Sequence, residues 1–177
     1  MSGISITLQA LYAGERRMER ELLAVAERHR ADHEVHHVAV DVARWSHDHV
    51  ERIAATAQHH GLHLPDPAED PPPDPRAQEP EHAEPGPDLL HDLRLLHLAA
   101  NENSLNWETL AQTARAARDD ELLDLATGCH PQTVRQMLWT NSLIKTLSPQ
   151  LLGSKAGMPD PDRSWAALPP PVPPGEP

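Results

Sequence analysis

Proline is distributed very unevenly along this chain of 177 residues. Eighteen of the nineteen prolines fall in two stretches, 62–87 and 149–177, and Pro131 is the only one elsewhere. Because proline lacks a backbone N–H and its ring clashes with the preceding turn, it breaks the interior of a helix. The two proline-poor blocks, 1–61 and 88–148, are therefore predicted to be helical. We expect 62–87 to be an extended linker and 149–177 a disordered tail.

The apolar residues favour helices over strands. The chain has no Phe, one Tyr and four Trp, so its core must be built from Leu, Ala, Val, Ile and Met. Strands prefer β-branched and aromatic residues, whereas Leu, Ala and Met are strong helix formers. The two blocks together hold roughly 120 residues, which is enough for one core. The predicted fold class is all-α.

Block 1–61 divides into two helices, over about 4–30 and 33–60. Asp32 is a plausible N-cap for the second helix and Gly61 a glycine that ends it. Apolar residues recur at steps of three and four, as one face of a helix requires. The two faces comprise Leu8, Leu11, Tyr12, Met18, Leu22, Val25 and Ala26, then Val35, Val38, Val42, Trp45, His49, Ile53 and Thr56.

Block 88–148 repeats this plan with helices over about 88–117 and 120–147. Asp88 should cap the first, Asp119 or Asp120 the second, and Pro149 should end the second. The two faces comprise Leu89, Leu93, Leu96, Ala100, Trp107, Leu110 and Ala114, then Leu122, Leu125, Ala126, Val134, Met137, Leu138, Ile144 and Leu147.

The length of the linker bears on how the two hairpins are joined. Helices of about 28 residues would be about 42 Å long. A proline-rich segment covers about 3.1 Å per residue, so 62–87 can run the whole length of such a bundle. We therefore expect one domain, an antiparallel four-helix bundle with a long crossover between its second and third helices. The alternative is a flexible tether between two loosely associated hairpins.

The charge pattern argues against two classes of partner. The formal net charge is −12, and the linker alone has seven acidic residues against Arg76. The chain has no basic stripe, so nucleic acid is not an expected partner. No apolar run reaches the roughly 20 residues that span a membrane, and residues 1–20 lack a signal-peptide pattern. We expect a cytoplasmic protein, with a single cysteine and hence no intramolecular disulfide.

Thirteen histidines are a clear excess, and one of them lies on an apolar face. His49 follows Trp45 by four residues and precedes Ile53 by four. Residues at equal distance from the turn of a hairpin lie at equal depth, which places His49 level with Glu15. Polar residues from all four helices should meet near this level, including Glu19, Ser46, Glu102, Asn103, Ser104, Cys129 and His130.

This layout resembles the ferritin-like four-helix proteins, whose carboxylates and histidines hold two metal ions. The family pattern is a Glu on the first and third helices and Glu-x-x-His on the second and fourth. The resemblance implies Glu15, His49, Glu102 and His130 as metal ligands, with Glu19 and Cys129 as further candidates and iron, manganese or zinc as the metal. Ser46 and Thr127 stand where each Glu of Glu-x-x-His would be.

Other patterns are less complete. His47 and Glu51 match one element of hemerythrin-like oxygen carriers, but their other ligand spacings are missing. Cys129 and His130 suggest a thiol–imidazole nucleophile, yet neighbouring residues of a helix point about 100° apart. The mid-bundle residues could also simply hydrogen-bond to one another.

We expect a non-enzymatic bundle that acts in assembly or partner binding, with a protein partner or a second copy of the chain. An apolar island in the tail, Trp165-Ala166-Ala167-Leu168, could take part by docking on the bundle or on a partner. The alternative function is a metal-binding, oxidase-like protein that uses the four ligands named above.

Overall fold

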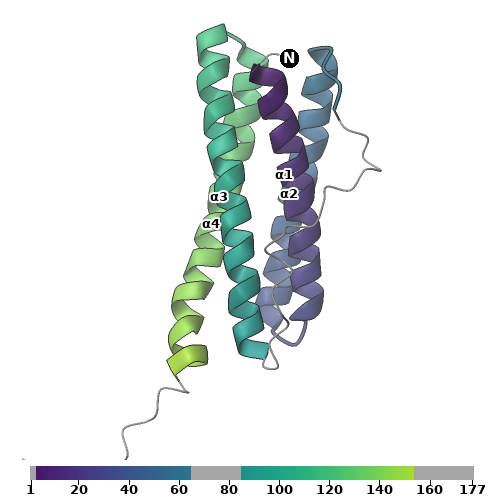
Figure 1. Ribbon diagram of the computed structural model, residues 1–177. Helices are drawn as coiled ribbons and strands as arrows, with labels where there is room; N and C mark the ends of the chain where they lie inside the picture. The colour runs from purple at the N-terminus through teal and green to yellow at the C-terminus, as the bar shows by residue number, and fades with distance from the viewer. Residues whose placement is uncertain (1–2, 65–84, 154–177) are drawn as a thin grey trace, which may run out of the picture.

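The computed structural model describes residues 3–64 and 85–153, and every regular element within those ranges is an α-helix. The all-α class predicted from the aliphatic composition is confirmed for this part of the chain. Most of the predicted linker and tail lies outside it. Four helices follow one another (Figure 1): α1 (Gly3–Arg28), α2 (His33–His59), α3 (Pro85–Ala117) and α4 (Asp120–Gly153).

Three of the predicted helix ends are confirmed by the residues that cap them. The Asp32 carboxylate accepts a hydrogen bond from the Val35 N–H at 3.1 Å, so Asp32 is the N-cap of α2. Asp119 caps α4 in the same way, through the Leu122 N–H at 3.1 Å. Gly61 follows α2 with a φ of +64°, a left-handed value that glycine adopts without steric cost.

Two predicted helix ends are wrong. α3 begins at Pro85, so Asp88 lies in its first turn instead of capping it. Proline is tolerated there because the N–H it lacks would have no partner in the helix. α4 continues past Pro149 to Gly153. Pro149 lacks only its own N–H, and water can reach the Lys145 carbonyl that loses this partner because both residues are exposed.

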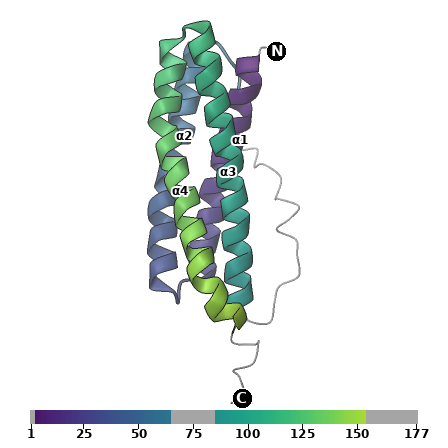
Figure 2. The ribbon, with the colours of Figure 1, turned by 90° about the vertical axis from the view of Figure 1, so that its left-hand side faces the viewer.

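The four helices lie side by side (Figures 1 and 2). α1 contacts α2 and α3, and α4 contacts α3 and α2, so each helix has two main neighbours. No helix within the described ranges combines the length and apolar character needed to cross a membrane.

The core consists of two apolar clusters, one toward each end of the helices. The cluster near the α1–α2 turn contains Met18, Leu22, Val25, Ala26, Val35, Ala39, Val42, Ala43, Leu89, Leu93, Leu96, Ala99 and Ala100. The cluster near the α3–α4 turn contains Leu8, Leu11, Tyr12, Ile53, Trp107, Leu110, Ala114, Leu122, Leu125, Ala126 and Cys129. Buried polar side chains lie between them.

The predicted inward face of α4 is only partly confirmed beyond Cys129, because Met137, Ile144 and Leu147 pack against the apolar cluster near the α1–α2 turn but the buried positions hold other residues. The buried residues there are all polar and continue from Cys129 at steps of three and four: Thr133, Gln136 and Thr140. Val134, Met137 and Leu138 were expected on this face, but Leu138 is 59% exposed and the other two are only partly buried. The backbone continues the stripe that begins at Leu122, whereas the prediction followed only apolar residues and therefore missed these three polar ones.

Candidate functional site

The Glu15 side chain is completely buried although it ends in a carboxyl group. It lies on the inward stripe of α1, four residues after Leu11 and three before Met18, so the helix itself directs it into the core. Its Oε1 accepts a hydrogen bond from Trp107 Nε1–H at 2.9 Å and another from the Thr133 hydroxyl at 3.4 Å. One carboxyl group thereby connects α1, α3 and α4.

His49 of α2 is buried beside Glu15. Its Nδ1 lies 3.3 Å from Glu15 Oε2, and its Nε2 lies 2.8 Å from Gln132 Oε1 on α4. The imidazole meets the Trp107 ring edge-on, with ring centroids 5.6 Å apart. The prediction that His49 and Glu15 lie at the same depth is confirmed, and all four helices contribute to this contact set.

The hydrogen bond to Gln132 determines where His49 carries a proton. An amide oxygen only accepts, so His49 Nε2 must donate. A neutral imidazole has one N–H, and its Nδ1 would then present a lone pair to Glu15 Oε2. Neither Nδ1 nor Oε2 has a hydrogen-bond partner, so their 3.3 Å separation is an ion-pair contact without hydrogen-bond geometry. A lone pair facing a carboxylate would be repulsive, so one of the two atoms must carry a proton, which makes the pair neutral overall, as a buried position requires.

Gln136 extends this polar layer by one turn of α4. Its Nε2 donates to the Ser46 hydroxyl and to the Val42 carbonyl of α2, both at 3.0 Å. The sequence prediction overlooked Gln132 and Gln136, because glutamine is usually a surface residue. Their spacing of four residues was the available signal, since it places both amides on one side of the helix.

The two other predicted carboxylates lie outside the core. Glu102 of α3 is exposed, and its Oε2 accepts a hydrogen bond from Arg17 at 2.8 Å. Glu19 is half-buried, with its Oε1 3.0 Å from His47 Nδ1. Both side chains form polar contacts near the bundle surface.

His130 and Cys129 are neighbours in sequence with different surroundings. His130 Nε2 lies 2.8 Å from the Ser104 hydroxyl and 4.0 Å from Glu108 Oε1. Cys129 is completely buried, and this burial raises the pKa of its thiol to about 12, which outweighs the opposing effect of Arg52. The thiol therefore stays protonated at neutral pH, which argues against the thiol–imidazole nucleophile.

The structure brings together two of the four predicted metal ligands. Glu15 and His49 are adjacent. Glu102 instead forms an ion pair with Arg17 at the surface, and His130 is hydrogen-bonded to Ser104. Within the described ranges, no three His, Cys, Asp or Glu side chains are arranged to hold a metal ion. As placed, these residues do not fit the di-metal centre that the ferritin-like resemblance implies. Metal binding stays a prediction that elemental analysis can test.

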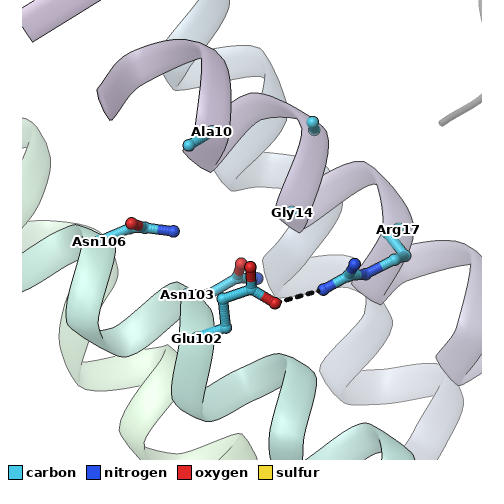
Figure 3. A pocket seen from close by; sticks show the side chains of 7 residues that line it. Ala10, Gly14, Arg17, Glu102, Asn103 and Asn106 are labelled. Atoms are coloured by element: carbon cyan, nitrogen blue, oxygen red, sulfur yellow. Dashed lines mark hydrogen bonds and ion pairs between the residues drawn. The ribbon is translucent and has the colours of Figure 1, made fainter. Parts of the chain in front are cut away.

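A hollow of about 260 Å³ lies between α1 and α3, close to the polar layer (Figure 3). Asn103 is 1% exposed, and neither polar atom of its amide has a hydrogen-bond partner. The amide rests against Gly14, and a Cβ added to Gly14 would lie 2.1 Å from Asn103 Oδ1. Glycine at this position therefore gives the Asn103 side chain its space. Ala10, Ala13, Arg17, Glu102 and Asn106 complete the lining.

Asp92 joins the start of α3 to the end of α1. It accepts hydrogen bonds from Arg28 at 2.9 and 3.0 Å, and His29 Nε2 lies 2.7 Å from its Oδ2. Burial alone would raise the pKa of Asp92, but the hydrogen bonds from His29 and Arg28 outweigh burial and lower it. This cluster stabilises the end of the bundle next to the α1–α2 turn.

Comparison of the chain with protein-family models, with curated proteins and with solved structures finds no match.

Proposed function

We propose that this chain is a non-enzymatic helical bundle that binds a protein segment through an apolar seam between α2 and α4. One observation carries this proposal. Between residues 130 and 152, α4 buries only polar side chains, while its apolar side chains there remain partly or largely exposed. Apolar residues concentrated on an incompletely covered helix mark an interaction surface.

The seam consists of Val38 and Trp45 on α2 with Trp139, Leu143 and Leu147 on α4. All five side chains are only partly buried, although they pack against the apolar cluster near the α1–α2 turn.

The position of the seam follows from helical periodicity. Gln136 contacts α2, and the α4 residues of the seam follow it by three, seven and eleven positions, which keeps them on the same side of α4. The α2 residues of the seam flank Val42, whose carbonyl bonds to Gln136, by four and three positions. Both sets therefore face the space between α2 and α4.

The course of α4 explains why the seam is incompletely covered. α4 packs more extensively on α3 than on α2. Figure 2 shows its C-terminal half leaning toward α3 and ending below it, away from the lower end of α2. The segment 130–153 carries Arg135 and Lys145 but no acidic residue, in a chain of net charge −12. By helical periodicity Lys145 lies about 180° and Arg135 about 100° around α4 from Gln136, so these charges do not face the seam, which suits an apolar partner segment.

For the fold as a whole, we infer an antiparallel four-helix bundle with ferritin-like connectivity. The colours in Figure 1 run downward along α1 and α4 and upward along α2 and α3, which supports this inference. With α2 and α3 running the same way, the chain between them has to return along the bundle, as a long crossover does.

A photo-crosslinking experiment tests the proposed function. The full chain would carry p-benzoylphenylalanine in place of Leu143 and would be illuminated in the cells that produce it. We expect products heavier than the chain itself, because a bound protein segment would contact this position. The matched control places the same probe at Leu138, which is exposed on another side of α4. If position 143 gives no more intermolecular product than position 138, the proposal is wrong.

A further inference from the structure

We propose that the apolar island of the C-terminal segment, Trp165-Ala166-Ala167-Leu168, docks on the α2–α4 seam of its own molecule. It would cover the seam until a partner displaces it. Only this displacement rests on the function proposed above, since intramolecular docking needs no partner. The segment 154–177 lies outside the described residues, and the features that favour docking are the seam, the amino-acid sequence of the segment and its length.

The chain is long enough to reach the seam. α4 ends at Gly153, and Trp165 follows twelve residues later. Twelve residues span at most about 40 Å when fully extended. Leu147 and Trp139 lie six and fourteen residues before Gly153, which corresponds to about 9 and 21 Å along the helix axis. Trp165 can therefore reach any part of the seam on α4, with slack for the chain to turn back.

The seam and the island have complementary chemistry. The island presents an indole, a leucine and two alanines to a surface of valine, leucine and tryptophan side chains.

Tethering makes the chain's own tail a stronger occupant than a second copy. A short flexible connection gives an effective concentration of the order of mM, so even a weak apolar contact becomes populated within one molecule. A second copy would have to supply the same contact at the much lower concentration of the protein in solution. The prolines on both sides of the island also reduce the conformational entropy lost on docking, because proline has a fixed φ.

The test places p-benzoylphenylalanine at position 165 of the purified full chain, at micromolar concentration. Illumination should give a product of monomer mass, and peptide mapping should join residue 165 to α2 or α4 near the seam. The same probe at Val172, four residues beyond the island, should react several-fold less with these peptides. Adding Leu143→Asp should abolish the seam product, while adding Leu138→Asp should leave it unchanged.

Each outcome decides the proposal. A product mainly of dimer mass would show that a second copy occupies the seam, and monomer-mass products spread over the bundle would show no specific docking. Either result overturns the proposal. If Leu143→Asp unfolds the protein, as far-UV circular dichroism would reveal, the peptide map of the chain without that change still decides. If the tail does not dock on the seam, position 143 can still form crosslinks to a partner protein, so the docking proposal and the proposed function can fail separately.

Discussion

Removal of the Glu15 carboxyl group should destabilise the bundle strongly. Glu15→Ala leaves Trp107 Nε1 buried without its hydrogen-bond acceptor and removes the carboxyl group that lies 3.3 Å from His49 Nδ1, and a buried polar group without a partner costs about 1–3 kcal/mol. The space left by the missing side chain adds to this loss. We expect the free energy of unfolding to fall by about 4 kcal/mol, within the range of about 3–5 kcal/mol for breaking a buried pair.

Glu15→Gln should be much less destabilising, because an amide N–H can supply the proton that the Glu15–His49 contact requires. The glutamine oxygen can still accept from Trp107, and its amide can donate to His49 Nδ1 while His49 Nε2 still donates to Gln132. The amide thus reproduces a neutral pair, and only the stronger charge-assisted hydrogen bonding is lost. We expect a loss of about 1 kcal/mol, which corresponds to one typical hydrogen bond.

Urea unfolding at pH 7, followed by far-UV circular dichroism, measures both losses. With a slope of about 2 kcal/mol per M, Glu15→Ala should lower the urea midpoint by about 2 M and Glu15→Gln by about 0.5 M. Glu19→Ala is the matched control, since its half-exposed contact with His47 is worth at most about 1 kcal/mol. If glutamine and alanine at position 15 are equally destabilising, a proton on one atom of the Glu15–His49 contact is not what stabilises this pair.

Three further predictions concern other parts of the bundle. Asp92→Asn should lower the free energy of unfolding by about 2 kcal/mol at pH 7, because charge-assisted hydrogen bonds are lost. Since these bonds lower the pKa of Asp92, their contribution to the free energy of unfolding is fully present above pH 3.8, the ordinary pKa of the group, and is lost as the pH falls through the lower pKa of the folded state. If the urea midpoints of the wild type and Asp92→Asn stay apart at low pH, this reasoning is contradicted. Gly14→Ala should lower the Tm measured by calorimetry, because the added methyl group meets the Asn103 side chain, and should raise the Tm when Asn103→Ala removes that side chain. Gly128→Ala meets only the flexible end of an arginine, so it should raise the Tm without a second substitution. The metal hypothesis predicts about one or two equivalents of iron, manganese or zinc in untagged protein after dialysis against a weak chelator, and none in His49→Ala; a wild-type content near zero would contradict it.

Depth along the bundle was predictable from the sequence. Counting residues from each turn placed His49 beside Glu15, and these side chains lie 3.3 Å apart. The same count put His130 level with about Trp107 and within one turn of Glu102 to Ser104, and His130 is hydrogen-bonded to Ser104. The count works because every residue of a helix advances by the same rise, so residues equally far from the turn of a hairpin lie at the same depth along the bundle.

Rotation about each helix axis was harder to predict. Glu102 and Asn103 lie at nearly the same depth but point about 100° apart, so one reaches solvent and the other the core. The prediction chose the carboxylate because metals bind it, whereas the backbone turns the amide inward. On α4, the buried stripe passes through Thr133, Gln136 and Thr140, and an assignment based on hydropathy alone therefore missed these polar residues.

The polar layer between the two apolar clusters also restricts how the helices can align. Leucine and alanine stripes are nearly interchangeable, so two such stripes could pair equally well after a shift of one turn. A shift of α1 by one turn would move Glu15 by about 5.4 Å along the axis, away from His49 and Trp107 and into an aliphatic environment. Shifted alignments would therefore bury a carboxyl group and an imidazole in the core without partners, which leaves a single alignment energetically accessible.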